Sequence, residues 1–384
     1  LAVQMHTLER GAIATFLVSD CPLLQGVHLD GLPKLRRVYT TRSSHSGAEP
    51  FSNLLQSHTA SIPTPMIGPD RMLAALPYSS GTTGLPKGVM LSHHNLVTNI
   101  YQLIGPNAVP LSHEEIMLCF LPLYHIYGMT VALNTMVALG ATLVIMPRFN
   151  VPQLCQIVTD EKISMIPLVP PALNALCQAA EAGAFPKNHH VRWVKSGAAP
   201  LAPELPRRFS ELTGIIVNQG YGMTEASPVT HVGYVSPPEL NRPSSIGQAL
   251  ALTDCRVVDE YGNEVGQGQS GELVMRGPQF MMGYWKAPEA TAAALRDGWY
   301  WSGDIVNRDV DDFYYVLDRR KEMIKYKGFP VAPAEIEAVL LEQLDRRAAV
   351  LELLARDLER IHRRLQSDPR QARRSASDAR DRRR

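Results

Sequence analysis

The densest group of potential anion-binding residues lies in the segment YSSGTTGLPKG (78–88). Glycines let the backbone approach a ligand closely and expose its N–H groups, hydroxyl side chains add donors, and a lysine supplies a point charge. A polyphosphate needs this combination, so the segment predicts a loop that holds the phosphates of a nucleotide. Its candidate binding residues are Ser79, Ser80, Gly81, Thr82, Thr83, Gly84 and Lys87.

This segment does not follow the Walker A pattern, in which a glycine directly precedes the lysine and a Ser or Thr directly follows it. Here Pro86 precedes Lys87 and Gly88 follows it, where a metal-binding hydroxyl is expected. A P-loop nucleotide hydrolase is therefore excluded. A plain Ser/Gly turn is the alternative, but it does not explain why the hydroxyl run and the lysine occur together.

Short apolar runs alternate with helical patterns from about residue 73 onward. This alternation indicates a layered α/β sheet, with strand-like runs at 116–124, 141–146, 163–169 and 191–197 and helical stretches at 93–104 and 152–161. Gly and Pro then recur from 245 to 316. They indicate a smaller, mainly antiparallel β unit with strands near 255–259, 272–276 and 313–318.

The chain divides on this basis into five segments. These are a partial N-terminal segment and linker (1–72), an α/β region with the 78–88 loop (73–244), a β-rich subdomain (245–317), a hinge with the start of a C-terminal domain (318–344) and an Arg-rich helical or disordered tail (345–384). Apolar residues repeat at three and four positions from Leu351 to Leu365. That pattern is compatible with a packing helix or a homodimer contact.

Composition and charge restrict the class of protein. With 45% hydrophobic and 20% charged residues, the chain is too apolar for a disordered protein and too polar for a membrane protein. The longest apolar run, 131–146, falls short of the ~20 apolar residues of a bilayer span. The net charge is +1, but the tail 345–384 carries thirteen arginines against seven acidic residues, which leaves −5 for the rest. We expect no membrane span and no nucleic-acid partner.

The five cysteines are an odd number and form no CxxC pair, which argues against a disulfide framework. The first residues show no signal peptide. Both observations favour a cytoplasmic location.

The loop SSGTTGLPKG resembles the phosphate loop of the adenylate-forming enzymes, which include acyl-CoA and aryl-CoA synthetases, firefly luciferase and the adenylation domains of peptide synthetases. Further segments match that family in order: SGAAPL (196–201), QGYGMTE (219–225), GELVMRGPQFMMGYW (271–285), DGWYWSGD (297–304) and DRRKEMIKYKGF (318–329). The resemblance covers about 73–341. PLYHIYGM (122–129) and the GMTEASP run are most similar to 4-coumarate:CoA ligases and their bacterial relatives.

The resemblance implies a site for ATP and Mg²⁺. In this family's arrangement Tyr221 stacks on adenine and Thr224 donates a hydroxyl, while Glu225, together with Thr82, holds the metal. Asp304 and Arg319 would contact the ribose. The other implied nucleotide-binding positions are Gly197, Ala198, Ala199, Gly220, Gly222 and Met223.

The resemblance also implies sites for the acid and for CoA. His125 would orient the carboxylate, in an apolar pocket lined by Tyr127, Gly197, Ala199 and Met223. No Asp or Glu lies near His125 in the sequence, which argues against amino acids and favours aromatic or medium-chain carboxylic acids. Lys321 looks like the hinge of the C-terminal domain, and the CoA thiol would approach near Lys325, Lys327 and Gly328.

The chemistry implied is attack of a carboxylate on the α-phosphorus of ATP, which gives acyl-AMP, followed by transfer of the acyl group to CoA. His125, Thr224, Glu225 and Lys87 are the groups expected to act on the reactants. The family places a lysine of its C-terminal domain between the two anions, but no lysine follows Lys327. We therefore expect the lid domain to be absent and adenylation to be weak or lost.

Other functions fit the same motifs, since a fold does not fix a function. One is an acyl-AMP ligase that loads a carrier protein, and another is a luciferase-type oxygenase. A third is a non-catalytic module that binds nucleotide or acyl-AMP and associates through the 351–365 helix.

Overall fold

The computed structural model describes residues 16–19, 37–40, 48–55, 68–79, 86–105, 108, 110–234, 240–319, 324–326 and 329–331. The chain forms two compact units. The first comprises Leu1–Cys255 and Val274–Trp301, and the second comprises Arg256–Leu273 and Ser302–Arg384.

A seven-stranded sheet forms the centre of the first unit, with the strand order β13-β12-β11-β10-β9-β7-β8. Strands β7 to β11 run parallel to one another, whereas β12 and β13 are antiparallel. The bounds are β7 (Ile116–Cys119), β8 (Thr142–Ile145), β9 (Met165–Leu168), β10 (Trp193–Ser196), β11 (Ile216–Gly222), β12 (Val229–Val232) and β13 (Gln248–Ala249). The predicted layered α/β sheet is confirmed.

Alternate residues of the parallel strands belong to two different cores. Leu118 and Val194 pack in one core, and their neighbours Met117 and Trp193 pack in the other. A strand that is buried on both faces reads as an almost continuous apolar run. That is why the sequence signal for these strands is an unbroken apolar stretch and not an alternation.

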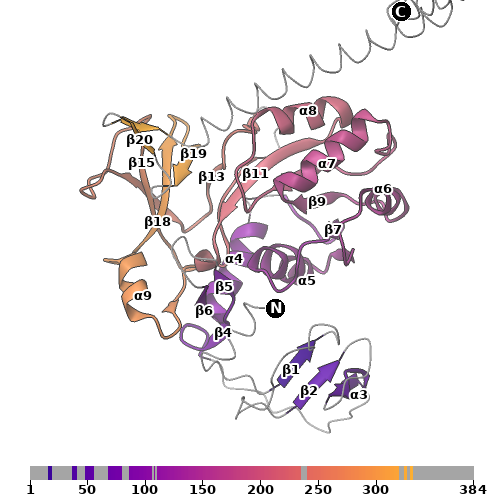
Figure 1. The fold of residues 1–384 in the computed structure, drawn as a ribbon, viewed down its shortest axis with the longest axis horizontal. Helices are drawn as coiled ribbons and strands as arrows, with labels where there is room; N and C mark the ends of the chain where they lie inside the picture. Colours follow the sequence, from indigo (N-terminus) through magenta and orange to yellow (C-terminus); the bar gives the residue numbers. More distant parts are fainter. Residues whose placement is uncertain are drawn as a thin grey trace, which may run out of the picture. The chain divides into compact units, whose positions relative to one another are not determined.

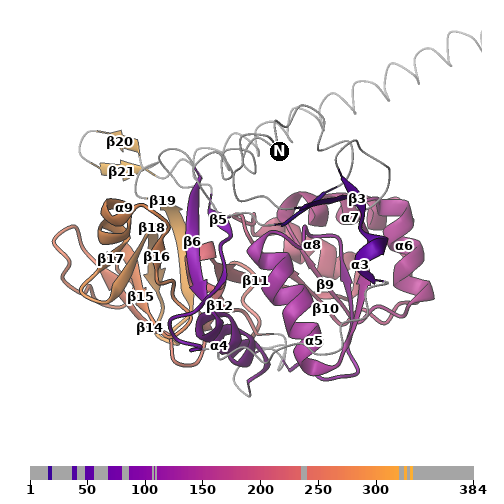
Figure 2. The same cartoon turned by 90° about the horizontal axis from the view of Figure 1, so that it is seen from below.

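Helices cover both faces of this sheet (Figures 1 and 2). One face packs against α6 (Val151–Asp160), α7 (Pro170–Glu181) and α8 (Glu204–Thr213), and the other against the π-helical η1 (Tyr127–Asn134) and α5 (Thr135–Leu139). Helix α4 (His93–Ile104) packs against η1 and α5. Its first turn is closed by a reciprocal capping box between Ser92 and Asn95. Asn150 caps α6 by accepting the N–H of Gln153 at 2.9 Å.

A smaller sheet of the first unit has the order β16-β6-β4, with β5 also paired to β6. Its strands are β4 (Leu73–Ala75), β5 (Tyr78–Ser79), β6 (Lys87–Ser92) and β16 (Gly283–Tyr284). Strands β5 and β6 are antiparallel, so they form the base of a hairpin whose connection carries most of the 78–88 loop. The remaining elements of this unit are β1 (Phe16–Ser19), β2 (Arg37–Thr40), β3 (Glu49–Pro50), α3 (Ser52–Leu55), the 3-10 turn η2 (Thr224–Ala226), α9 (Pro288–Ala294) and β17 (Leu295–Arg296).

The β-rich region that follows is also confirmed. Strands β14 (Asp254–Val258), β15 (Gly271–Arg276) and β18 (Trp299–Arg308) join β17 in the order β14-β15-β18-β17, and β19 (Tyr314–Arg319) pairs with β18. A hairpin of β20 (Ile324–Tyr326) and β21 (Phe329–Val331) lies in the second unit.

Several predictions concern residues that the structure does not describe. The hinge residue Lys321, the lid domain and the 351–365 helix are among them. Within the described ranges, none of the helices has the length and apolar character of a membrane span. Cys119, Cys155 and Cys177 are free thiols.

Candidate active site

The carboxyl edge of the parallel strands gathers the predicted acid-binding and adenine-binding segments. The chain runs from β7 outward to β8 and then returns past β7 to β9, so the direction of strand addition reverses between β7 and β9. In open α/β sheets, ligands bind at the carboxyl ends of the strands near such a reversal. His125 and Tyr127 follow β7, the 197–199 segment follows β10, and the 220–225 segment ends β11 and continues into η2.

Tyr127 joins two of these segments. Its hydroxyl donates to the main-chain oxygen of Lys195 at 3.1 Å, and its ring lies 3.4 Å from the position that a Cβ on Gly197 would occupy. Burial raises the pKa of Tyr127 far above its usual value, so the phenol stays protonated. Glycine at 197 therefore leaves open the space in front of the Tyr127 ring.

His125 is an exposed side chain on the loop before η1. Its Nδ1 accepts the N–H of Tyr127 at 3.2 Å, which assigns the proton of the neutral ring to Nε2. Removal from water by surrounding protein atoms lowers its pKa below the usual value. A neutral imidazole with Nε2–H can donate to a substrate carboxylate.

Lys195 is a site residue that the sequence analysis missed. Its side chain is 7% exposed, and its Nζ donates to the main-chain oxygen of Gly233 at 3.2 Å. Burial lowers its pKa to about 7, and it has no carboxylate partner within the described part of the chain. The signal that could have found it is a lysine in WVKS (193–196), a strand in which all four residues are buried.

The 197–199 segment turns sharply away from β10. Ala198 adopts a left-handed conformation with a φ of +68°, and Ala198 and Ala199 are exposed while Gly197 is buried. Their small side chains leave the edge of the sheet uncovered at this point. The geometry is compatible with the prediction that a flat base or an acyl group lies there.

The phosphate hairpin is described at its base. Ser79 and Lys87 lie directly opposite each other in the β5–β6 pair, and the Oγ of Ser79 is buried without a hydrogen-bond partner in the described residues. An unpaired buried hydroxyl is costly, so a ligand oxygen would satisfy it. Five predicted binding residues lie outside the described ranges: Ser80, Gly81, Thr82, Thr83 and Gly84.

Glu225 lies in η2, directly after β11, and is 6% exposed. Its Oε1 accepts the hydroxyl of Tyr284 at 2.7 Å, and this is the one side-chain hydrogen bond of the carboxylate to the described residues. Mg²⁺ is usually bound by one or two carboxylates together with substrate phosphates. The second oxygen of Glu225 therefore fits a metal that is shared with a nucleotide. Thr224 beside it is also buried.

Tyr221 projects from the end of β11 with a half-buried side chain. The buried ring of His231 lies 5.7 Å away, roughly edge to face. The next residue, Gly222, must lack a side chain, because a Cβ at this position would collide with the main-chain oxygen of Pro228. Gly220 and Met223 flank this turn.

The predicted ribose residues belong to the second unit. Asp304 on β18 lies opposite Arg319 on β19 in an antiparallel pair, so the two residues share one register position. Lys325 lies in β20. Lys327 and Gly328, predicted near CoA, lie outside the described residues.

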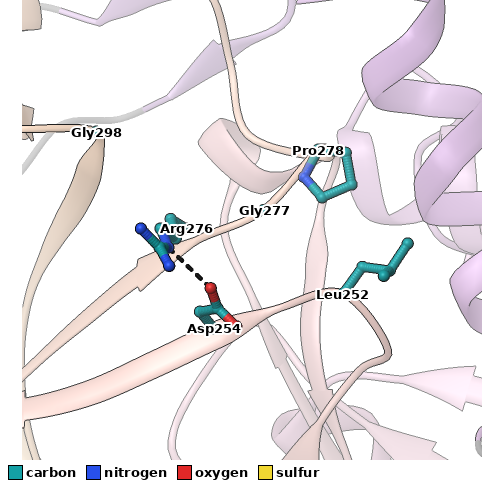
Figure 3. A pocket seen from close by; sticks show the side chains of 6 residues that line it. All are labelled: Leu252, Asp254, Arg276, Gly277, Pro278 and Gly298. Carbon is teal, nitrogen blue, oxygen red and sulfur yellow. Dashed lines mark hydrogen bonds and ion pairs between the residues drawn. The ribbon is translucent and has the colours of Figure 1, made fainter.

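An open hollow of about 520 Å³ lies elsewhere in the first unit (Figure 3). None of its lining residues is a predicted site residue; they are Leu252, Asp254, Arg276, Gly277, Pro278 and Gly298. The two charges at its wall neutralise each other, because Arg276 Nε donates to Asp254 at 2.8 Å. We therefore place the candidate active site at the carboxyl edge of the main sheet and not here.

A doubly covered parallel sheet, with a glycine- and hydroxyl-rich hairpin and a buried carboxylate after β11, is the architecture of an adenylate-forming α/β enzyme. Comparisons with known proteins agree. The sequence profile described as "AMP-binding enzyme" matches residues 7–285. The chain belongs to this family. The match begins well before residue 73, where the motifs were first recognised.

Three relatives illustrate the similarity. The chain is 42% identical over 306 residues to 4-coumarate–CoA ligase 2 of Nicotiana tabacum, covering 78% of this chain and 56% of that protein. It matches the ATP-bound structure of MatB from Rhodopseudomonas palustris with a TM-score of 0.75 and 28% identity, over 87% of this chain and 65% of that one. It also matches the structure of MenE of Bacillus subtilis, an o-succinylbenzoate–CoA synthetase with ATP and magnesium bound. The TM-score is 0.73 and the identity 25%, and the match covers 89% of this chain and 67% of that one. The chain thus spans a little over half the length of the curated relative.

Proposed function

We propose that this chain binds ATP, Mg²⁺ and a carboxylic acid, and that the protein to which it belongs joins the acid to CoA through an acyl-AMP intermediate. The family membership supports this activity, because the relatives named above are CoA ligases or bind ATP. The roles given to individual residues are part of the proposal.

One observation carries the proposal. Tyr127, from the acid segment, donates a hydrogen bond to the main chain of β10 at Lys195, and its ring lies 3.4 Å from the position that a Cβ on Gly197, in the adenine segment, would occupy. A carboxylate can attack the α-phosphorus only when both substrates lie side by side in a fixed orientation. The contact between the two segments provides that adjacency.

The residues at the nucleotide end would act mainly by placing charges. Tyr221 would stack on adenine, Lys87 and the hydroxyls of the hairpin would hold phosphate oxygens, and Glu225 would hold Mg²⁺. The metal, when bound, would neutralise charge that develops on the phosphates. Asp304 and Arg319 would contact the ribose, and Lys325, Lys327 and Gly328 would lie near CoA.

The residues at the acid end would select the substrate. His125 would donate its Nε2–H to the carboxylate, and Tyr127 and Gly197 would form an apolar wall of moderate size, with Ala199 and Met223 beside it. This supports aromatic or medium-chain carboxylic acids as substrates. A cytoplasmic location and a homodimer through 351–365 stay predictions.

The test is a pair of measurements on the full chain. Isothermal titration with ATP, with and without Mg²⁺, should show metal-dependent binding, and a panel of cinnamic, benzoic and medium-chain fatty acids should bind more tightly in the presence of a non-hydrolysable ATP analogue. Exchange of pyrophosphate into ATP, measured on the same chain, should depend on the presence of an acid that binds. Failure to bind ATP in any condition would refute the proposal.

A further inference from the structure

Residues 281–285 form part of the motif GELVMRGPQFMMGYW, to which the proposed function gives no role. In the structure they connect two predicted ligand-binding elements. The N–H of Met281 donates to the main-chain oxygen of Glu225 at 2.8 Å, and the N–H of Trp285 donates to that of Gly88 at 2.8 Å. Strand β16 pairs with β6, with Tyr284 opposite Val89. The segment therefore ties the turn that carries Glu225 to the base of the phosphate hairpin.

Tyr284 is the side chain at this junction, and it is 7% exposed. Its hydroxyl donates to Glu225 Oε1 at 2.7 Å, and its ring centroid lies 5.2 Å from the Nζ of Lys87. A cation at this distance from an aromatic face is attracted by the ring. A single buried side chain thus contacts both the predicted metal carboxylate and the predicted phosphate lysine.

The contacts of Tyr284 keep these two charges available. A carboxylate and an ammonium that meet directly form an ion pair, which would occupy the groups that a metal and a phosphate need. Lys87 and Glu225 form no such pair with each other in the described part of the chain. The phenol engages one carboxylate oxygen through its hydroxyl, and the ammonium faces the ring, so each charge keeps a free side.

We propose that Tyr284 is a positioning residue that orients Glu225 for Mg²⁺ and holds Lys87 apart from it, ready for a phosphate. This role rests on the proposed function, since it concerns the binding of ATP with a metal. The two contacts can be removed separately. Tyr284→Phe removes the hydrogen bond to Glu225 and keeps the ring, whereas Tyr284→Leu removes both.

The experiment measures the affinity of the full chain for ATP by isothermal titration, in excess Mg²⁺ and in excess EDTA. We expect Tyr284→Phe to weaken binding about 10-fold with Mg²⁺, the loss typical when a metal ligand loses its outer partner, and by less than about twofold in EDTA. Tyr284→Leu should in addition weaken binding about 3-fold in EDTA, through loss of the cation–π contact. Tyr261→Phe is the matched control, since Tyr261 is 82% exposed.

A double-mutant cycle tests whether Tyr284 affects ATP binding through Glu225. In a Glu225→Gln background, Tyr284→Phe should cause no further loss with Mg²⁺. Equal losses in Mg²⁺ and in EDTA would show a merely structural role and overturn the inference, as would a Tyr284→Phe protein that matches the Tyr261→Phe control. If Tyr284→Phe does not fold, Tyr284→Leu takes its place, and its loss of affinity with Mg²⁺ should exceed its loss in EDTA about 10-fold.

The outcome separates this role from the proposed function. An unsubstituted chain that binds no ATP in either condition overturns the proposed function and the role of Tyr284 with it. An unsubstituted chain that binds ATP in a metal-dependent way, beside a Tyr284→Phe variant of unchanged metal dependence, overturns the role of Tyr284 alone.

Discussion

The nucleotide end and the acid end of the candidate site are built in different ways. At the nucleotide end, side chains contact each other directly: buried Tyr284 contacts buried Glu225 and half-buried Lys87. At the acid end, Tyr127 bonds a main-chain oxygen of β10, and Gly197 contributes only open space. The first end therefore depends on the identity of its side chains, and the second depends on shape.

Because of this difference, substitutions at the two ends should affect different ligands. In the proposed reaction ATP and Mg²⁺ take part whichever acid is used, so a fixed set of charged and hydroxyl groups suits them. The acid varies between relatives, and an apolar wall can change its shape without disturbing the charges. Substitutions at the nucleotide end should weaken ATP binding whichever acid is used, whereas substitutions at the acid end should change which acid binds.

The largest effect is expected for Glu225→Gln. The amide is a poor ligand for Mg²⁺, so ATP affinity in the presence of the metal should fall about 100-fold, and the affinity in EDTA should stay within about twofold. Titration calorimetry with ATP measures both values. Glu260→Gln, at an exposed position, is the control. If Glu225→Gln still bound ATP tightly in a metal-dependent way, Glu225 would not be the Mg²⁺ ligand, and the metal site would have to lie elsewhere.

Gly197→Val should act on the acid end. The new side chain would extend toward the Tyr127 ring, which already lies 3.4 Å from a Cβ at this position, so the affinity for the best acid of the panel should fall about 30-fold. ATP affinity should change by no more than about threefold. Gly68→Val is the control, because a Cβ at position 68 has nothing within 4 Å. An equal loss for ATP and acid would show that Gly197 serves both ends.

The sequence predicts the helices and strands of the site better than it predicts the contacts between them. The helix expected at 93–104 is α4 (His93–Ile104), and that at 152–161 is shifted by one residue in α6 (Val151–Asp160), because capping by Ser92 and Asn150 is local information. The apolar run 116–124 is a strand only over Ile116–Cys119. The chain then leaves the sheet at the edge where the site lies.

The contacts between distant residues could not be predicted from local patterns. Tyr127 and Lys195 are 68 residues apart, and Glu225 and Tyr284 are 59 apart. Whether two such residues meet depends on strand order and register, which no short segment encodes. Lys195 escaped notice for the same reason, since its burial follows from the position of β10 between two other strands.

Lys195→Met tests the charge at the acid end through the pH dependence of the free energy of unfolding. The buried lysine has a pKa of about 7 in the folded protein and an ordinary pKa near 10.4 when unfolded. Between these values the unfolded chain binds more protons, so the free energy of unfolding of the unsubstituted protein should rise with pH from about 7 upward. That stabilisation is lost as the pH falls through the folded pKa.

A methionine side chain does not titrate, so it adds no pH dependence to the free energy of unfolding. The free energy of unfolding of Lys195→Met minus that of the unsubstituted chain should therefore be about 2 kcal/mol larger at pH 6.5 than at pH 8.5. Urea denaturation at the two pH values measures this difference. Exposed Lys162→Met should show no comparable change. A pH-independent difference for Lys195→Met would mean that the ammonium keeps an ordinary pKa, and the acid end would then carry a fixed positive charge.

Tyr127→Phe should have the smallest effect and separates packing from hydrogen bonding at the acid end. The ring that faces Gly197 is kept, and only the hydrogen bond to the Lys195 main chain is lost. Stability should fall by about 1 kcal/mol, since a buried carbonyl loses its donor. Acid affinity should fall no more than about 5-fold, and metal-dependent ATP affinity should not change. If ATP affinity fell as far as it does in Tyr284→Phe, the two ends would act as one polar network, and shape would not be what distinguishes the acid end.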